Sequence, residues 1–388
     1  MYSIVISRVE DKNIICILEN GVLTEKYEEQ IGKRLEGNIY VGKVENVLKK
    51  MQVAFVNIGE EKNAFIHLKD VLPKVDEKLE KNNQQNERIN SVLKPGMPIL
   101  VQIKRDSTNQ KGARISTHIN LPGKYIVFLP NSSFITISQK IEDEEEKKRL
   151  ISYVENVLPD GTGAIIRTAA ENKEKDAIAQ DLNDLIKKWE DIISQDCSTY
   201  PQIIYHNDSL IKKILIDLIE KKIDTVIVDN EENFKEIQEI IKEQGKTVEV
   251  KKVSNAIEEE GLEDKIEKLK NRNVWLNCGG FITIDKTEAL TAIDVNSGKY
   301  DGKTDLETTA YTVNLEATDE IAKQLKLRDI GGIIIVDYID MLDNENKKKI
   351  QDRMLQNLKA DRAKTQVEGF TKLNLMELTR KHICNNEE

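Results

Sequence analysis

The chain has 388 residues, of which 32% are charged, and a formal net charge of −10 at pH 7. This length suffices for about two to four domains with buried cores. No long apolar run occurs, and the N-terminus lacks the charged-then-apolar layout of a signal peptide, so we expect a cytoplasmic protein. A negative net charge ordinarily disfavours binding of nucleic acid. Binding of a polyanion depends on local basic patches, however, so the net charge does not exclude a nucleic-acid-binding protein.

Four cysteines are spread along the chain without a CxxC or Cys/His spacing: Cys16, Cys197, Cys278 and Cys384. This distribution argues against a disulfide framework and against a self-contained zinc site. We therefore expect plain thiols.

Residues 1–35 contain two alternating apolar runs, SIVISRV and IICILEN, and the strong two-residue turn signal Asn20-Gly21. We interpret the segment as a β-hairpin that must join a larger sheet, because an isolated hairpin is only marginally stable. The expected partner is residues 202–253, which alternate strand, helix, strand, helix and strand, beginning with Ile203, Ile204 and Tyr205.

Residues 37–118 contain many short alternating runs punctuated by glycine, a pattern typical of a small β-barrel. Phe55 and Phe65 lie in this segment, and from the pattern alone both would be ordinary barrel core. Residues 75–91 lack apolar periodicity and are rich in asparagine and glutamine, so we expect a mobile loop within the barrel.

Residues 119–201 predict an acidic helix over 143–154 and, after the run GTGAIIRTAAEN, a heptad-like helix. The apolar positions of the second helix are Ile178, Leu182, Leu185, Trp189 and Ile192. Arg167 and Thr168 follow a strand between the helices. A planar guanidinium beside a hydroxyl suits a phosphate, although such a pair is usually just a solvated strand end.

The run ALTAIDVNSG, residues 289–298, predicts a strand whose alternate side chains share one face. That face changes from apolar to oxygen-bearing towards the end of the strand: Leu290, Ala292, Asp294 and Asn296.

A helix is predicted next, starting with a capping box formed by Thr304 and Glu307 and ending at the pair Gly331-Gly332. Its apolar positions recur at helical spacing: Leu306, Ala310, Val313, Ala317, Ile321 and Leu325. A short apolar strand, residues 333–336, follows and is closed by Asp337.

A strand, a crossover helix and a second strand favour parallel pairing, so both strands end at one edge of the sheet and Asp294 should meet Asp337. Two carboxylates and the Asn296 amide oxygen form an oxygen-only site that suits Mg²⁺ or Mn²⁺. The alternative is that acidic residues at strand ends only cap turns. Asp340 is expected on the opposite strand face from Asp337 and is interpreted as structural.

Three blocks of the sequence resemble the catalytic region of the ribonuclease E/G family of endoribonucleases: TEALTAIDVNSG, NLEATDEIAKQLKLRDIGGIIIVDYIDM and DRAKTQVEGFTKLNLMELTRK. The resemblance covers nearly the whole chain. It implies that Asp294 and Asp337 bind a catalytic Mg²⁺, with Mn²⁺ as a possible substitute. It also implies that Asn296 orients one of these carboxylates or the scissile phosphate.

Two further groups of site residues are implied by the same resemblance. Phe55 and Phe65 match positions on which an RNA base stacks, and Arg105 and Lys111 match basic positions along the RNA track. A terminal 5′ monophosphate is gripped at positions that match Arg167 and Thr168, with help from the backbone at Gly123 and Val127.

The implied fold class is a multidomain α/β protein. A ribonuclease-H-like domain, without that fold's own active site, is interrupted by an S1-type OB fold and a 5′ sensor and is followed by a DNase-I-like catalytic domain. The boundaries are 1–35 with 202–273 for the first domain, 36–118 for the OB fold, 119–201 for the sensor and 274–388 for the catalytic domain.

We therefore predict a magnesium-dependent endoribonuclease that cuts single-stranded RNA, leaves 5′-phosphate and 3′-hydroxyl ends, and prefers 5′-monophosphorylated substrates. A rival of another class is a catalytically idle RNA-binding or scaffold protein, against which the presence of Asp294, Asn296 and Asp337 speaks. The sequence does not separate a narrow role in ribosomal RNA processing from general messenger RNA decay.

Residues 347–364 predict an amphipathic helix. Its inward positions are Ile350, Met354, Leu355 and Leu358, and its outward positions are Arg353, Lys359, Arg362 and Lys364. The acidic run over residues 258–267 predicts a solvated helical face or a linker.

The C-terminus departs from the family pattern. Relatives continue into a CPxC segment whose thiols share a zinc ion between two subunits, whereas this sequence ends in KHICNNEE. We therefore expect no zinc and, where a homo-oligomer forms, no zinc link of this kind through Cys384.

Overall fold

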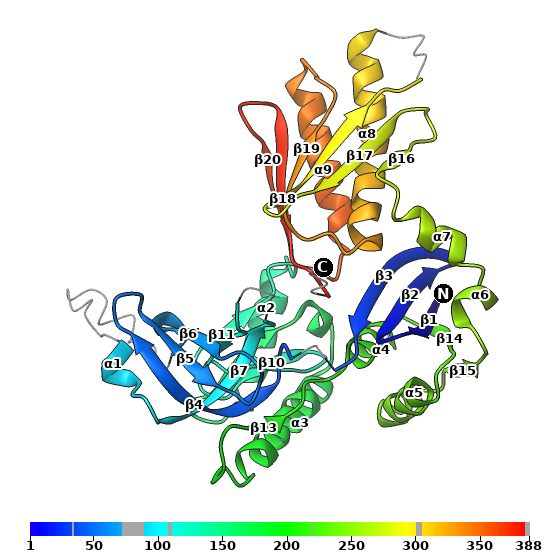
Figure 1. Ribbon diagram of the computed structural model, residues 1–388. Coiled ribbons are helices and arrows are strands. Elements are labelled where there is room, and N and C mark those ends of the chain that lie inside the picture. The colour runs from blue at the N-terminus through cyan, green and yellow to red at the C-terminus, as the bar shows by residue number, and fades with distance from the viewer. Residues whose placement is uncertain (33–34, 72–88, 108–110, 220, 300–304, 385–388) are drawn as a thin grey trace. The chain divides into compact units, whose positions relative to one another are not determined.

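The computed structural model describes residues 1–32, 35–71, 89–107, 111–219, 221–299 and 305–384 (Figure 1). The chain divides into two compact units. Unit 1 consists of Met1–Ile31 and Leu210–Glu388, and unit 2 of Gly32–Ser209. Over the described residues, each unit contains two β-sheets, so the chain is a multidomain α/β protein as predicted.

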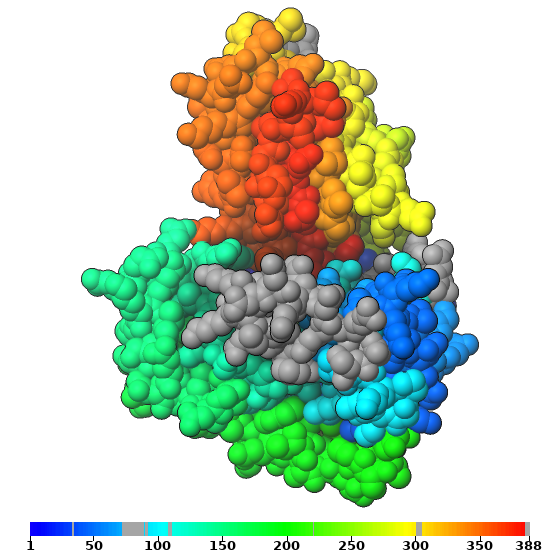
Figure 2. Space-filling view, turned by 90° about the vertical axis from the view of Figure 1, so that its left-hand side faces the viewer, coloured from blue at the N-terminus to red at the C-terminus, as the bar shows by residue number. Residues whose placement is uncertain are grey.

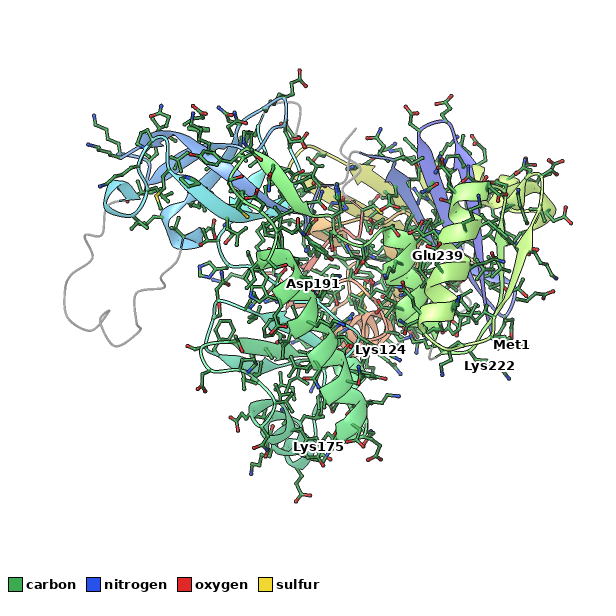
Figure 3. The ribbon with its side chains drawn as sticks, turned by 90° about the horizontal axis from the view of Figure 1, so that it is seen from below. Met1, Lys124, Lys175, Asp191, Lys222 and Glu239 are labelled. Atoms are coloured by element: carbon green, nitrogen blue, oxygen red, sulfur yellow. The ribbon has the colours of Figure 1, made fainter. Side chains whose placement is uncertain are left out.

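The first sheet of unit 1 has five strands in the order β15-β14-β1-β2-β3. Their bounds are Tyr2–Val9 for β1, Lys12–Glu19 for β2, Val22–Gln30 for β3, Ile223–Val228 for β14 and Glu249–Lys252 for β15. The predicted hairpin is thus a three-stranded meander, because a tight turn at Glu10 precedes the one at Asn20 and Gly21. Figure 3 shows Met1 beside Lys222, where β1 and β14 start in parallel.

Helices cover both faces of this sheet. α4 (Leu210–Ile219) and α5 (Glu231–Glu243) pack on one face, in a core that contains Ile4, Ile6, Ile15 and Ile17. The short helices α6 (Ala256–Glu259) and α7 (Glu263–Lys268) lie in the acidic run, and apolar residues in and around them pack on the other face. Their acidic side chains are mostly exposed, so this run is a solvated helical face as predicted.

The second sheet of unit 1 has six strands in the order β16-β17-β18-β19-β21-β20. The bounds are Asn273–Trp275 for β16, Phe281–Lys286 for β17, Leu290–Asn296 for β18, Gly332–Asp337 for β19, Thr365–Phe370 for β20 and Leu375–Arg380 for β21. α8 (Leu306–Leu327) and α9 (Asn344–Leu358) bury one face of it. The hairpin of β20 and β21 is at the surface, in red beside the orange segment, in Figure 2.

α8 starts one residue later than predicted. Its N-cap is Asp305, whose carboxylate accepts from the Thr308 N–H at 2.9 Å. Thr304 lies outside the described residues, and Glu307 accepts from the backbone of a later segment instead of closing a capping box. Leu306 is 90% exposed and so does not belong to the apolar face, whereas the other five predicted positions are buried.

The C-terminus of α8 also differs from the prediction. The helix ends at Leu327, where Asp329 adopts the left-handed conformation with φ 45° and the Ile330 N–H donates to the Leu325 carbonyl at 3.0 Å. This is a Schellman turn, in which aspartate takes the position usually held by glycine. Gly331 instead precedes β19, which begins at Gly332, and a side chain on Gly331 would collide with His382.

α9 buries Ile350, Met354 and Leu358 as predicted, but it ends at Leu358 and leaves Leu355 46% exposed. Arg362 was expected on the outward face of a longer helix. Because it follows the helix end, its guanidinium instead donates to Glu25 of β3 at 2.7 Å and is largely buried. This contact joins the two sheets of unit 1.

A buried ion network lies at the end of β21. The Arg380 side chain is fully buried and donates to Asp361 and to Asp329, at 2.8 Å each. Asp329 also accepts from the backbone N–H of Ile383 and Cys384. Cys384 then packs into the apolar core of the first sheet, so this network fixes the C-terminal segment to both sheets of unit 1.

Arg380→Ala should lower the free energy of unfolding by about 3–5 kcal/mol, because Asp329 and Asp361 would stay buried without a counter-charge. Urea denaturation followed by circular dichroism measures this loss. Arg272→Ala is the matched control: its pair with Asp285 is exposed, so its removal should leave the free energy of unfolding nearly unchanged. Equal losses of unfolding free energy in the two variants would contradict the stabilising role assigned to the buried Arg380 network.

Unit 2 contains a five-stranded barrel, in which β4, β5, β6, β8 and β7 follow one another and β7 pairs back with β4. The bounds are Ile39–Leu48 for β4, Val53–Asn57 for β5, Ala64–His67 for β6, Pro98–Arg105 for β7 and Arg114–Ser116 for β8. The short helices η1 (Leu68–Asp70) and α1 (Ile89–Val92) accompany it. Most of the loop predicted for residues 75–91 lies outside the described residues.

β13 (Gln202–Tyr205) pairs antiparallel with β4 of the barrel. The expectation that this strand opens the α/β segment of residues 202–253 is therefore wrong. Alternating apolar residues predict a strand there, but they do not say which of two sheets it joins.

The second sheet of unit 2 has four strands in the order β11-β12-β10-β9. The bounds are Leu121–Pro122 for β9, Ile126–Leu129 for β10, Ile135–Ile137 for β11 and Gly163–Ile166 for β12. α2 (Glu144–Glu155) and α3 (Lys175–Ile193) pack against it, and the 3₁₀ turn η2 (Thr168–Ala170) follows β12. The predicted apolar positions of α3 pack into this core; in Figure 3, Lys175 and Asp191 mark its two ends.

Across the described part of the chain, no helix combines the length and apolar character needed to cross a bilayer.

Candidate active site

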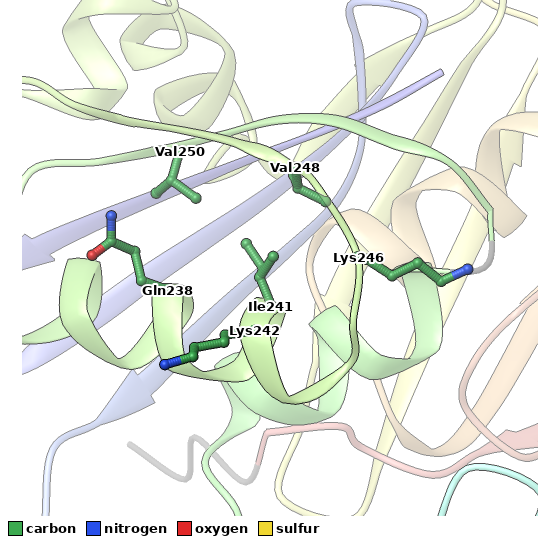
Figure 4. A pocket seen from close by; sticks show the side chains of 6 residues that line it. All are labelled: Gln238, Ile241, Lys242, Lys246, Val248 and Val250. Carbon is green, nitrogen blue, oxygen red and sulfur yellow. The ribbon is translucent and has the colours of Figure 1, made fainter.

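A hollow of about 350 Å³ lies beside α5 and β15 (Figure 4). It is lined by Gln238, Ile241, Lys242, Lys246, Val248 and Val250. This lining contains no carboxylate, hydroxyl or thiol, so it offers neither a metal ligand nor a nucleophile of those kinds. The predicted catalytic residues lie instead on the solvent-facing side of the six-stranded sheet.

β18 places its polar residues as the alternation predicts. Thr291, Ile293 and Val295 are buried against the helices, whereas Asp294 is exposed and Asn296 half-exposed on the other face. β18 pairs in parallel with β19, and Asp294 lies directly opposite Asp337 in that register. The crossover helix α8 thus brings together two carboxylates that are 43 positions apart in the sequence.

Asn296 acts on Asp294 through its amide nitrogen. Its Nδ2 donates to Asp294 Oδ2 at 2.7 Å, which fixes the orientation of that carboxylate. Behind Asn296 the backbone is tightly packed, because a Cβ on Gly280 would lie only 2.8 Å from the Asn296 carbonyl. Asn296 is therefore positioned to hold Asp294 rather than to move freely.

The two carboxylates repel one another. Partial burial, followed by the charges of Asp294 and Asp340, raises the pKa of Asp337 above its ordinary value. The expectation that Asp340 lies on the opposite strand face assumed that the strand continues beyond Asp337. β19 ends at Asp337, so strand alternation does not extend to Asp340.

The residues present fit a magnesium ion. Mg²⁺ keeps several waters and is commonly bound through one or two carboxylates, and a cation between Asp294 and Asp337 would relieve their repulsion. Where the structure is described, no group of three or more His, Cys, Asp or Glu side chains is arranged to hold a metal ion. A largely hydrated ion such as Mg²⁺ needs only one or two protein carboxylates, which Asp294 and Asp337 offer.

Asn314, which the sequence analysis overlooked, supports this site from α8. It is fully buried, donates from Nδ2 to the Ile339 carbonyl at 2.8 Å and accepts from the Ile339 N–H at 3.1 Å. Glu307 accepts from the Leu342 and Asp343 N–H groups. These bonds fix the segment that follows Asp337. The sequence signal was an asparagine on the apolar side of an otherwise regular helix.

A sequence model of the ribonuclease E/G family matches residues 120–383. The chain belongs to the ribonuclease E/G family. Family membership makes it an endoribonuclease, a hydrolase that acts on RNA, as the three sequence blocks predicted.

Among the relatives of this ribonuclease E/G family member is ribonuclease G of Haemophilus influenzae, 38% identical over 385 residues that cover 96% of this chain and 78% of that protein. Ribonuclease G of Escherichia coli (strain K12) is 34% identical, over 96% of this chain and 80% of that protein. Ribonuclease E of Synechocystis sp. is 34% identical, over 97% of this chain and 57% of that protein.

In the barrel, the two predicted stacking residues are neighbours. Phe55 lies directly opposite Phe65 between β5 and β6, and both are half-buried, whereas the flanking Ala54, Val56, Ala64 and Ile66 fill the core. Both rings are thus on the outer face, not in the barrel core. The same register continues from Phe65 to Arg114 of β8 and from Arg114 to Arg105 of β7.

Arg114 was missed by the sequence analysis, because only the pairing of β6 with β8 reveals it. It donates to Asp70 at 2.7 Å. Lys111, predicted beside the RNA track, is exposed in the turn before β8 and does not belong to this row of paired residues.

Three of the predicted phosphate-binding residues lie at one end of the four-stranded sheet, and Val127 lies within β10 of the same sheet. Arg167 Nη1 donates to the Gly123 carbonyl at 2.6 Å, and the Thr168 hydroxyl is 2.7 Å from that of Ser138. A Cβ on Gly123 would lie only 2.8 Å from the Asp181 carboxylate and from Leu185 Cδ1, so those side chains would have to shift to admit one.

Asp181 of α3 holds the backbone beside Gly123. Its carboxylate accepts from the N–H groups of Lys124, Tyr125 and Ile126 at 2.8–3.0 Å. The loop that contacts Arg167 is therefore preorganised, and no sequence pattern indicated this role for Asp181.

Asp337→Asn should stabilise the protein in the presence of a chelator at about pH 7.5. Because the folded-state pKa of Asp337 is raised, ionisation of this group costs stability above that pKa, and the cost disappears below the unfolded value of about 4. The variant should melt at a higher temperature than the wild type at about pH 7.5, with a difference that shrinks as the pH falls towards 4. A lower melting temperature of Asp337→Asn near neutral pH would contradict the inferred repulsion between Asp294 and Asp337.

Proposed function

We propose that this chain is a magnesium-dependent endoribonuclease that cuts single-stranded RNA and leaves 5′-phosphate and 3′-hydroxyl ends. The observation that carries the proposal is the register of β18 with β19, which sets Asp294 beside Asp337 on an exposed sheet face. Family membership supplies the reaction class, and this pair supplies the chemistry for it.

The roles of the residues follow from their contacts. Asp294 and Asp337 would bind the magnesium ion, and Asn296 would hold Asp294 in the orientation for binding through the 2.7 Å hydrogen bond. A bound Mg²⁺ would lower the pKa of a water and neutralise the charge that develops on the scissile phosphodiester. The exposed sheet face leaves room for an RNA strand to approach both carboxylates.

For RNA binding outside the catalytic pair, we propose that the barrel is an S1-type OB fold. Phe55 and Phe65 would stack on bases, while Arg105 and Lys111 would contact the phosphates. Support comes from the outward register of the two rings and from the continuation of that row to Arg105.

The remaining assignments are also proposals. Residues 1–35 with 202–273 would form a ribonuclease-H-like domain, residues 119–201 the 5′ sensor and residues 274–388 a DNase-I-like catalytic domain. The pairing of β13 with the barrel moves the start of the second ribonuclease-H-like segment beyond Tyr205. In the sensor, Arg167 and Thr168 would grip a 5′ monophosphate beside Gly123 and Val127.

Asp294→Asn and Asp337→Asn should each lower the cleavage rate by about a hundredfold or more while RNA binding persists, because each removes a ligand for an ion whose effect amounts to several kcal/mol. Cleavage of a single-stranded A/U-rich RNA with and without Mg²⁺, with mapping of the product ends, measures this.

Asp285→Asn is the matched control, since Asp285 lies on the same sheet face but pairs with Arg272. It should cleave like the wild type. If the Asp294 and Asp337 variants also cleave normally, the assignment of these residues to the active site is wrong. If the wild type binds RNA without cutting it under any metal condition, the idle RNA-binding alternative holds.

Arg167→Ala should remove the preference for 5′-monophosphorylated over 5′-hydroxyl RNA. An arginine-phosphate hydrogen bond contributes about 1.5–3 kcal/mol, so cleavage of the monophosphorylated substrate should slow by roughly ten- to a hundredfold at limiting concentration. Initial rates on matched monophosphorylated, hydroxyl-ended and circular RNAs measure the effect.

Lys147→Ala serves as the control for loss of a positive charge, since Lys147 lies on α2 and pairs with Glu144. It should keep the substrate preference. Equal slowing of Arg167→Ala on all three RNAs would mean that Arg167 supports the fold or general RNA binding, and the sensor assignment would fall.

A further inference from the structure

Two aromatic rings lie beside the catalytic pair on the same sheet face. Trp275 of β16 is 64% exposed, and Phe281 of β17 is half-buried. The centroids of their rings are 5.1 Å apart with an angle of 51° between the planes. A largely exposed tryptophan that contacts a second ring forms an apolar aromatic surface, and such a surface often marks a binding site.

Strand register connects these rings to the catalytic residues. Trp275 lies opposite Phe281, and Phe281 lies opposite Asn296, so the three form one row across β16, β17 and β18. The adjacent row contains Asp294 and Asp337. Because neighbouring strands are about 4.8 Å apart, the rings begin one strand away from the amide that holds Asp294.

The two rings are held in place by a short hairpin. The Glu316 carboxylate of α8 accepts from the N–H groups of Asn277 and Cys278 at 2.6 and 3.0 Å. The Leu276 N–H donates to the Gly280 carbonyl at 2.9 Å and closes the turn. The rings therefore flank a turn that is fixed to the helix beneath the sheet, which limits the entropy lost when a ligand stacks on them.

The charges on this face favour recognition of bases over recognition of the phosphate backbone. At the paired positions on the exposed side of β16 to β19 and β21, the charged residues are all acidic: Asp285, Asp294, Asp337 and Glu377. Arg272 neutralises Asp285, so the acidic charge is concentrated at Asp294, Asp337 and Glu377. Such a surface repels phosphates except where a cation is bound. Stacking on aromatic rings does not depend on charge and accepts any base.

We propose that Trp275 and Phe281 form a stacking platform for a base of single-stranded RNA next to the scissile phosphate. This inference rests on the proposed catalytic role of Asp294 and Asp337. The platform attracts the substrate where the surrounding carboxylates do not, and it holds the strand so that the phosphate meets the catalytic pair. Trp275 and Phe281 are thus positioning residues.

Fluorescence of Trp275 tests the stacking directly. The chain has two tryptophans, and Trp189 packs into the core of unit 2, so Trp189→Phe leaves Trp275 as the only reporter. In that variant combined with Asp294→Asn, single-stranded A/U RNA should quench the emission saturably. The same oligonucleotide made entirely of abasic residues should quench it several-fold less at equal occupancy. Unchanged emission at RNA concentrations that saturate binding would overturn the proposal.

Kinetics provide the second test. Trp275→Ala and Phe281→Ala should lower kcat/KM on single-stranded RNA by about 5- to 150-fold, the range measured for loss of one stacked base. Trp275→Phe should stay within about threefold of the wild type, whereas Trp275→Leu, which keeps apolar bulk without a ring, should resemble Trp275→Ala. Ile333→Ala is the control, because Ile333 is 51% exposed on the same face but aliphatic.

The catalytic role of Asp294 and Asp337 and the stacking role of Trp275 and Phe281 can be refuted separately. Normal cleavage by Asp294→Asn would contradict the catalytic assignment. Normal cleavage by Trp275→Ala, with Asp294→Asn inactive, would contradict only the proposed stacking platform. The stacking proposal would also be overturned if Trp275→Ala changed the oligomeric state without RNA and the Trp275 emission of the reporter variant stayed unquenched. This face would then be a contact between protein chains.

Discussion

Parallel pairing of β18 with β19 is the constraint on which the candidate site depends. The two strands end at the same edge, and their register sets Asp294 against Asp337. This arrangement is unfavourable for the isolated chain, because it brings two negative charges together and raises the pKa of Asp337. It is maintained by the core on the opposite face of the sheet, where α8 and α9 bury the alternate residues of the same strands.

α8 does more than connect the two strands. Glu307 near its start and Asn314 in its third turn bind the backbone that follows Asp337, and Glu316 binds the turn between β16 and β17. Asp329 at its end holds Arg380 and the C-terminal segment. One helix therefore sets the backbone on several sides of the exposed face, and the polar residues that do so are those a purely apolar pattern ignores.

The sequence was sufficient to predict that the two carboxylates meet, but not to predict their surroundings. Alternation along β18 and the strand-helix-strand order predicted which face Asp294 takes and that it meets Asp337, since both follow from local geometry. Local rules were wrong at the ends of α8, where Asp305 and Asp329 replaced the expected Thr304 and glycine caps. Several residues can cap a helix, and the choice depends on tertiary partners such as Arg380.

Other features depended on long-range pairing, which a periodic pattern does not contain. β13 joins the barrel and not the sheet of β1, and Arg114 becomes a neighbour of Phe65 only through the pairing of β6 with β8. Strand alternation does not decide which face Asp340 takes, because β19 ends at Asp337. Trp275 was passed over because its neighbour Phe281 is recognisable only from the β16–β17 register.

We propose that Asp294 and Asp337 hold one divalent cation between them. Binding of Mn²⁺ can be measured by electron paramagnetic resonance on the wild type, the two single Asp→Asn variants and the double variant. If both carboxylates hold the same ion, each single variant should lose the site, and the double variant should lose no more. Binding that survives in either single variant, or that falls independently and additively, would contradict the shared site.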